Sequence, residues 1–491
     1  MRKLRNTIPW NAACAVLLLC FATTPSSAQT FTTIANFGAP QTGSEPDYGP
    51  LAQGLDGNFY GATTAGGVGG RGTTYKMTPT GRLTRLDRFG GDHGSAPYGG
   101  LIQATNGNLY GTTSDGGPDR AGTLFKMTID GALNTLRSFN GTDGETPYAT
   151  LIQAVNGNFY GTTVEGGASS GCNGYACGTI FEITPSGTLT TLYSFCSQSN
   201  CTDGAEPFAG LVQAANGTFY GTTTAGGAFA SECGGQGCGT VFKITPSGEL
   251  ATLYSFCSQT NCTDGKNPDA ALLQAEDGNF YGTTSGGGLG GGTIFKITPS
   301  GTLTTLYNFC SQSNCTDGYT PYAALIQATD GNFYGTTYLG GGGGNCFYGC
   351  GTVFKITAGG ALTTLHSFSG PDGEGLDAGL VQATNGKLYG TTSGGGTKIT
   401  GTGTAFSLSM GLGPFVETLI GSGKVGATVI ILGTKLTGTT AVSFNGTAAA
   451  FTVVSETEIT TTVPSGATTG FVTVTTPSGK LKSNKKFRIT G

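Results

Sequence analysis

The sequence predicts an all-β protein, a seven-bladed β-propeller closed by its N-terminal strand and followed by an immunoglobulin-like β-sandwich. Three observations support this prediction. A Tyr-Gly pair recurs seven times at intervals of 50 to 61 residues, a period typical of propellers and repeat arrays. Each copy contains strand-length runs rich in β-branched and aromatic residues. The last copy lacks its fourth run, while an unmatched run of that type, FTTIANF, lies at residues 31–37.

The N-terminal segment has the layout of a signal peptide. Basic residues (Arg2, Lys3 and Arg5) precede an apolar stretch at 12–22, and small residues follow at 26–28. We therefore predict a signal peptide over residues 1–28. No later apolar run approaches the ~20 residues that would span a bilayer. The expected product is secreted or exposed at the cell surface, with no membrane span.

Residues 29–410 are predicted to form the propeller. One copy, residues 148–195, shows the order of its parts: YATLIQA, the turn VNGN, FYGTT, a variable loop, GTIFEIT, the turn PSG and LTTLYSF. Four strands joined in this way make one propeller blade. The run at 31–37 is expected to complete the seventh blade, which leaves no open sheet edge. An open superhelical array is the alternative, and it would leave residues 31–37 without a partner strand.

The cysteines lie in the long loops, which are predicted to emerge on one side of the blades, the long-loop face. An even number of cysteines in an exported chain favours disulfides. Zinc is the competing interpretation, but the doublets lack histidine partners and the usual C-x-x-C spacing. We expect a local bridge in each doublet, with a Cys177–Cys196 bridge as an alternative. The doublets are Cys172/Cys177, Cys196/Cys201, Cys233/Cys238, Cys257/Cys262, Cys310/Cys315 and Cys346/Cys350.

Two residue types recur in nearly every copy. The tyrosine of the Tyr-Gly pair occupies the same place on each second strand, which indicates packing in the core. An aspartate recurs in the loops between copies, and a turn explains it better than a ring of Ca²⁺ ligands, because Ca²⁺ needs six to eight converging oxygens. These aspartates are Asp92, Asp143, Asp203, Asp264, Asp317 and Asp372.

Composition argues against several function classes. The formal net charge is −4 before the basic N-terminal segment is set aside, which disfavours nucleic acid as a partner. The two histidines, His93 and His366, are several copies apart, so no Ser-His-Asp arrangement and no metal triad can be assembled. Glu165 with Asp203 is a conceivable carboxylate pair for polysaccharide hydrolysis. We predict a protein that is not an enzyme and needs no cofactor or metal.

The runs FYGTT, GTIFKITPSG and LTTLYSF resemble the Gloeobacter/Verrucomicrobia (GloVer) tandem repeat over residues 31–409. The first copy departs from the pattern with GATTAGG. The resemblance implies an exported bacterial protein and no defined activity.

Residues 415–491 resemble an IPT/TIG domain, which is immunoglobulin-like. The run SGKVGATVIILGTKLTGTTAVSFNG and the later SETEITTTVPSGATTGFVTV carry this resemblance. Several short alternating strands over about 80 residues predict the same fold. The cations at its end could contact an anionic polymer, although lysines also protect exposed strand edges. They are Lys480, Lys482, Lys485, Lys486 and Arg488.

These observations predict a binding or scaffold protein that contacts an extracellular polysaccharide or a surface protein through the long-loop face. The only tryptophan, Trp10, lies in the predicted signal peptide, so ligand stacking would fall to loop aromatics. The candidates are Phe229, Tyr338, Phe347 and Tyr348. The alternatives are a polysaccharide-degrading hydrolase or lyase and a structural matrix protein.

Overall fold

The protein is all-β, with almost no helix. The computed structural model describes residues 29–38, 41–67, 69–168, 177–342, 346–397 and 401–490. The predicted signal peptide, residues 1–28, lies outside these ranges. Among the described residues, no helix has the length and apolarity needed to cross a bilayer.

The described part of residues 29–410 forms seven four-stranded antiparallel sheets, an arrangement consistent with repeated propeller-like blades. The first strands are β2 (Ala52–Gln53), β6 (Ile102–Gln103), β10 (Ile152–Gln153), β14 (Val212–Gln213), β18 (Leu273–Gln274), β22 (Ile326–Gln327) and β26 (Val381–Gln382). The second strands are β3 (Phe59–Thr63), β7 (Leu109–Thr113), β11 (Phe159–Thr163), β15 (Phe219–Thr223), β19 (Phe280–Thr284), β23 (Phe333–Thr337) and β27 (Leu388–Thr392). The third strands are β4 (Thr73–Met77), β8 (Thr123–Met127), β12 (Thr179–Ile183), β16 (Thr240–Ile244), β20 (Thr293–Ile297), β24 (Thr352–Ile356) and β28 (Thr404–Ser409). The fourth strands are β5 (Leu83–Arg88), β9 (Leu133–Ser138), β13 (Leu189–Ser194), β17 (Leu250–Ser255), β21 (Leu303–Asn308) and β25 (Leu362–Ser367).

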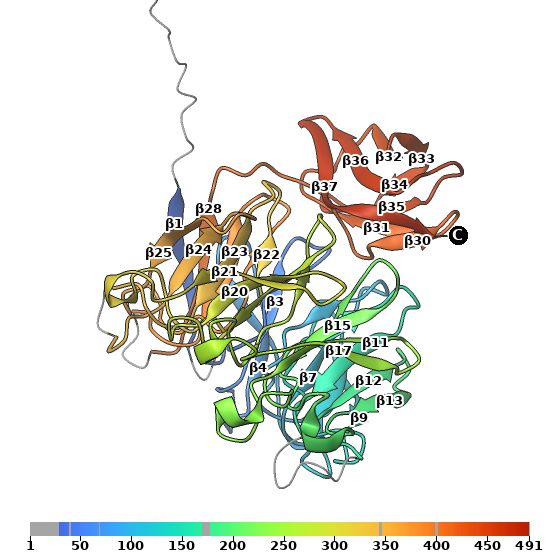
Figure 1. The fold of residues 1–491 in the computed structure, drawn as a ribbon. Coiled ribbons are helices and arrows are strands. Elements are labelled where there is room, and N and C mark those ends of the chain that lie inside the picture. The colour runs from blue at the N-terminus through green and yellow to red at the C-terminus, as the bar shows by residue number, and fades with distance from the viewer. Residues whose placement is uncertain are drawn as a thin grey trace, which may run out of the picture.

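The last of these sheets takes its fourth strand from the other end of the region. β1 (Thr30–Asn36) pairs antiparallel with β28, and the order in that sheet is β1-β28-β27-β26. Figure 1 shows β1 beside β28 and β25. The sequence prediction that residues 31–37 complete the last copy is therefore confirmed.

The motif Tyr-Gly-Thr-Thr is explained by packing between strands. All seven tyrosines are at most 4% exposed, which confirms their predicted place in the core. The glycine leaves room for an aromatic ring, because a Cβ at Gly161 would lie 2.6 Å from Cζ of Phe181. The last threonine bonds to the first residue of the third strand, as in Thr163 with Thr179 at 2.8 Å. The repeated residues thus fix the spacing of the second and third strands.

The long loops are stiffened by disulfides and by buried aspartates. The described residues contain five local bridges: Cys196–Cys201, Cys233–Cys238, Cys257–Cys262, Cys310–Cys315 and Cys346–Cys350. Cys172 lies outside the described residues. Asp203 is fully buried and accepts bonds from the Tyr193 hydroxyl and from the backbone N–H groups of Ser197 and Gln198. Asp264 and Asp317 repeat these contacts. The loop aspartates therefore organise turns, as the sequence predicts.

Single turns of 3-10 helix complete the loops. They are η1 (Gly91–His93), η2 (Ser199–Cys201), η3 (Ala230–Cys233), η4 (Thr260–Cys262) and η5 (Ser313–Cys315).

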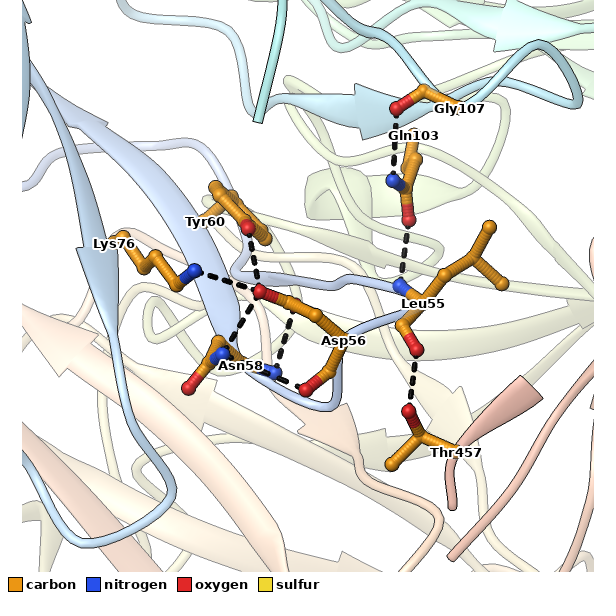
Figure 2. Close-up of polar contacts among 8 residues, drawn as sticks. All are labelled: Leu55, Asp56, Asn58, Tyr60, Lys76, Gln103, Gly107 and Thr457. Atoms are coloured by element: carbon orange, nitrogen blue, oxygen red, sulfur yellow. Dashed lines mark hydrogen bonds and ion pairs between the residues drawn. The ribbon is translucent and has the colours of Figure 1, made fainter. Parts of the chain in front are cut away.

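Neighbouring sheets are joined by one recurrent glutamine contact at the end that carries the short turns, which we call the short-turn end. In six of the seven copies, the glutamine that closes the first strand accepts a bond from the backbone of the neighbouring copy, as in Leu55 N–H to Gln103 Oε1 at 2.7 Å (Figure 2). The same bond joins Thr384 N–H, in the last copy, to Gln53 Oε1 in the first at 2.9 Å. The last and first copies are therefore in contact as other neighbours are.

The C-terminal unit contains two further sheets, ordered β29-β31-β35-β34 and β30-β37-β36-β32-β33. Its strands are β29 (Glu417–Thr418), β30 (Ser422–Lys424), β31 (Thr428–Leu432), β32 (Ala441–Phe444), β33 (Thr447–Ala449), β34 (Phe451–Val453), β35 (Glu458–Thr462), β36 (Gly470–Thr476) and β37 (Gly479–Thr490). Both sheets contribute to one apolar core that includes Val429, Ile431, Phe444 and Phe487. Thr457 Oγ1 donates a hydrogen bond to the carbonyl of Leu55, so this unit lies against the short-turn end (Figures 1 and 2).

Candidate functional site

The candidate site is built from a tight turn that precedes the first strand of each copy. In the third copy, Thr146 has a φ of 58°. Its N–H donates to the carbonyl of Ala121 in the preceding copy, and its carbonyl accepts from Val164 N–H in its own. Glu45 N–H bonds in the same way to Thr402 of the last copy, at 3.2 Å. Each turn is therefore held by two hydrogen bonds, one from the preceding copy and one from its own. These bonds fix the orientation of the residue two positions later, which is Tyr148 in the third copy.

The residue held in this way differs between copies. It lies three positions before the buried leucine that precedes the first strand, and in most copies it follows a proline, which restricts the backbone. Counted back from that leucine, the seven equivalent residues are Tyr48, Tyr98, Tyr148, Phe208, Asp269, Tyr322 and Asp377; the first copy has one extra residue, so its counterpart counted forward from the turn is Asp47. Five are aromatic and two are acidic, so this position combines stacking surfaces with carboxylates.

Each of these seven residues lines at least one of two adjoining cavities, which together we call the central pocket. The inner cavity has a volume of about 630 Å³ and is lined by Tyr48, Tyr148, Phe208, Asp269, Tyr322 and Asp377 among others. The outer cavity, of about 710 Å³, shares four of these residues and adds Tyr98 and long-loop residues such as Tyr338, Cys346 and Glu374. Volumes of this size are typical of ligand sites. The central pocket therefore opens at the long-loop end.

The aromatic residues contact one another across copies. The ring centroids of Tyr98 and Tyr148 are 4.5 Å apart, those of Tyr48 and Tyr98 are 5.5 Å apart, and those of Tyr148 and Phe208 are 5.2 Å apart. Tyr338 packs edge-on against Tyr322 at 5.6 Å. These rings offer faces and hydroxyls to a ligand without a large change of conformation.

Two carboxylates of the pocket, Asp377 and Asp47, each have one oxygen without a hydrogen-bond partner among the described residues. Asp377 is only 6% exposed, and its Oδ1 has no hydrogen-bond partner among the described residues. The neighbouring Asp47 also has an unpaired Oδ1, while its Oδ2 accepts from Thr64 Oγ1 at 2.8 Å. An unpaired buried polar group costs about 1–3 kcal/mol.

The pKa values reflect this burial. Burial raises the pKa of Asp377, and the nearby charge of Asp47 raises it further. Burial also raises the pKa of Asp47, in spite of the bond from Thr64. Burial raises the pKa of Asp269 to about 6, against the opposing bonds from Ser285 and Thr224. Asp377 lines both cavities, Asp269 the inner and Asp47 the outer, and perturbed carboxyls gathered at one pocket are typical of functional sites.

The sequence-predicted aromatics do not form one cluster. Tyr338 lies at the outer cavity, whereas Phe347 and Tyr348 are 91% and 70% exposed and contact each other at 4.7 Å. Phe229 is 36% exposed and does not line the central pocket. Only Tyr338 is therefore brought to the seven equivalent residues.

The other chemistry-bearing residues named from the sequence are separate from the pocket. Asp203 is committed to its turn, so it is not available to pair with Glu165. His366 bonds to Asp372 at 2.8 Å and stacks on Phe31, while His93 contacts Thr135. The sulfurs of Cys233, Cys238, Cys257 and Cys262 all lie within 4.8 Å of one another, but they form two disulfides and offer no thiolate to a metal.

Sequence reasoning missed the seven equivalent residues because they stand inside apolar runs such as YATLIQA. That run was assigned to a strand, whereas the strand is only Ile152–Gln153. The available signal was the change from Tyr to Asp at one aligned position after proline.

Solved structures with a related fold include enzymes. A fungal alcohol oxidase of the AA5 family, solved in complex with copper, matches 94% of this chain and 99% of its own, at 12% identity and a TM-score of 0.50. A putative 6-phosphogluconolactonase from Bacteroides uniformis matches 65% of this chain and 83% of its own, at 18% identity and a TM-score of 0.43. A gluconolactonase from Xanthomonas campestris matches 76% of this chain and 98% of its own, at 11% identity and a TM-score of 0.39.

The expectation that the protein is not an enzyme is corrected by this comparison. It rested on the scarcity of histidine, yet the fungal alcohol oxidase shares the fold over nearly its whole length and is an enzyme. The likeness concerns the fold alone and transfers no activity to this chain. It does show that an architecture of this kind supports catalysis, so the fold gives no reason to exclude it.

The family comparison covers most of the chain. No curated protein matches it. The model of the Gloeobacter/Verrucomicrobia repeat matches twice, over residues 19–234 and 229–453, and thus extends beyond the predicted end of the repeat region at residue 410. The chain belongs to the Gloeobacter/Verrucomicrobia repeat family.

Proposed function

We propose that this is an exported binding protein whose central pocket takes up a segment of an extracellular polysaccharide. The observation that carries the proposal is the convergence of seven equivalent residues, five aromatic and two acidic, on one pocket. Sugar rings stack on aromatic faces, and their hydroxyls donate to carboxylates. A surface protein is the other partner to consider, but a concave pocket suits a narrow chain better than a flat protein surface.

The proposal includes the architecture. In it, residues 29–410 are a closed seven-bladed propeller with the pocket on its axis. The contacts of Thr384 with Gln53 and of Thr402 with Glu45 support closure, because they repeat the contacts between other neighbours. Residues 415–491 are an immunoglobulin-like sandwich of the IPT/TIG type, supported by two sheets around one core.

Two observations support the proposal that the protein is exported. The disulfides fit an extracellular protein, because reducing compartments keep cysteines as thiols. Residues 1–28 are proposed to be the signal peptide that directs export.

The test is a glycan array followed by calorimetric titration of the best ligand with wild-type protein and the Tyr148→Ala variant. Tyr148 contributes to both cavities, so its loss is expected to weaken binding about tenfold or more, since one stacking contact is worth ~1.4 kcal/mol. Leu289→Ala is the control, because Leu289 is an exposed apolar residue of a long loop outside the pocket. Binding that survives Tyr148→Ala and is lost in Leu289→Ala would contradict the proposal.

Hydrolysis of the bound polysaccharide is a second candidate function. Asp269, whose pKa is raised to about 6, lines the same cavity as Asp377, and a carboxyl that is half protonated at that pH is suited to act as a general acid in mildly acidic solution. New reducing ends, formed by wild-type protein and abolished in Asp269→Asn, would establish this activity. Binding without new reducing ends would restrict the function to recognition.

A further inference from the structure

We infer that the polysaccharide bound in the central pocket carries a free amino group, and that its ammonium is held by Asp47 and Asp377 within the cluster of Tyr48, Tyr98 and Tyr148. This inference rests on the proposed function and names the chemical class of its ligand, an amino sugar that is not acetylated.

The first argument is that the pocket contains acceptors without donors. Asp47 Oδ1 and Asp377 Oδ1 are the unpaired buried carboxylate oxygens among the described residues. Asp377 lines both cavities and is 6% exposed, so the group that satisfies it must enter through the pocket. A ligand donor is therefore expected at this point.

The second argument is that four other carboxylates of the repeats already have a basic partner: Asp56, Asp143, Asp277 and Asp372. Asp56 pairs with Lys76 at 2.7 Å, as Figure 2 shows, and Asp277 pairs with Lys296 at 3.0 Å. Arg137 is paired with Asp143. The pocket differs, because no lysine, arginine or histidine is among the described residues that line either cavity, whereas Glu45 and Glu374 add further negative charge. A cation supplied from outside would balance this charge.

The third argument is that aromatic rings surround the carboxylates. Tyr48 is 5.5 Å from Tyr98 and 6.5 Å from Tyr148, between ring centroids, and its backbone N–H bonds to Asp377. Aromatic faces attract ammonium groups, and the attraction grows when the group is desolvated. Carboxylates beside aromatic faces select an ammonium over a neutral hydroxyl and repel acidic sugars.

A metal ion fits the same residues less well. Ca²⁺ takes six to eight oxygens from one place. Among the described residues, the groups of three or more side chains able to hold a metal are two clusters of cysteines, one of them with Glu374, and neither contains Asp47 or Asp377. An organic cation, which needs fewer ligands and uses the rings, is the better match.

The experiment compares three β-1,4-linked tetrasaccharides of glucosamine, N-acetylglucosamine and glucose by calorimetric titration near pH 6. The amino and hydroxyl substituents are nearly equal in size, so a pocket that selects by size alone cannot prefer glucosamine to glucose by a wide margin. We expect the glucosamine tetramer to bind at least tenfold more tightly than the other two. Raising the ionic strength should weaken its binding selectively.

Two variants complete the test. Asp377→Asn keeps the shape but puts a neutral amide in place of the ionisable carboxyl, so it should abolish the preference for glucosamine while leaving the weaker binding of the neutral tetramers. Asp119→Asn is the matched control, because Asp119 is an exposed carboxylate in a long loop outside the pocket, and it should keep the preference.

The outcomes separate the inference from the proposed function. Equal binding of all three tetramers, with Tyr148→Ala weakening each, would overturn the amine inference alone. A preference that persists in Asp377→Asn would also overturn it. Binding of none of the three tetramers, while another sugar on the array binds, would overturn the amine inference alone. If no sugar on the array binds, both the inference and the proposed function are overturned.

Discussion

The two ends of the repeat region differ in how similar the aligned residues of the copies are. At the short-turn end the copies are alike: Gln103, Gln153 and Gln53 each accept a backbone bond from a neighbouring copy, and the C-terminal unit lies over that end. At the long-loop end the aligned residues change, as from Tyr148 to Asp269 and Asp377, and they line the pocket. Identity between copies thus marks contacts that fold the protein, and difference marks the place where a ligand can be recognised.

The largest expected effect comes from a repeated core residue. Tyr160 is almost fully buried, and its hydroxyl donates to Glu182 Oε1 at 2.6 Å. Tyr160→Ala should lower the free energy of unfolding by about 3–5 kcal/mol, as large-to-small core changes do, and leave the affinity of the folded protein unchanged. Tyr160→Phe, which loses only the hydroxyl, should cost about 1 kcal/mol. Chemical denaturation measures both. If both variants lower the free energy of unfolding by the same amount, the aromatic ring of Tyr160 does not contribute to the stability of the core.

A smaller effect tests the junction between the last and first copies. Gln53→Ala leaves the N–H of Thr384 without its acceptor and should lower the free energy of unfolding by about 1–3 kcal/mol. Gln153→Ala removes the same contact between two internal copies, but Thr105 is exposed and its N–H can bond to water, so a smaller loss is expected. If Gln53→Ala leaves the free energy of unfolding unchanged while Gln153→Ala lowers it, the contact between the last and first copies does not stabilise the protein.

The smallest effect is expected at the disulfides of the long-loop end. Each bridge closes a ring of a few residues, such as Cys196 to Cys201, and stabilises the fold by at most about 2 kcal/mol. Reduction should therefore expose the loops to a nonspecific protease before the sheets unfold. The control is a free-thiol titration of the unreduced protein, for which we expect almost no reactive thiol. Abundant thiols in that titration would contradict the bridges.

Much of the repeat region could be predicted from the sequence, because strand runs, Asn-Gly turns and the unmatched run at 31–37 are local or countable signals. The place of the repeated tyrosines followed from their constant position. The central pocket could not be predicted, since it depends on residues from all copies meeting at one point.

The turns that orient the pocket residues have no signature in the local sequence. Thr146, Glu206 and Ala96 have φ values of 58°, 57° and 53°, a region these residue types seldom adopt without outside support. Contacts from the preceding copy supply that support, as Ala121 does for Thr146. The sequence of one copy alone does not reveal these contacts with its neighbour.

The measurement that tests the central claim most directly is the thermal stability of Asp377→Asn at pH 4 and at pH 9, without ligand. A carboxyl whose pKa is raised by folding carries no penalty below its unfolded pKa near 4, and the penalty grows as the pH rises through the folded value. If Asp377 serves a ligand and not the fold, the variant should match the wild type at pH 4 and melt at a clearly higher temperature at pH 9. A lower melting temperature for Asp377→Asn at pH 9 would show that this carboxylate stabilises the structure, and would contradict the account.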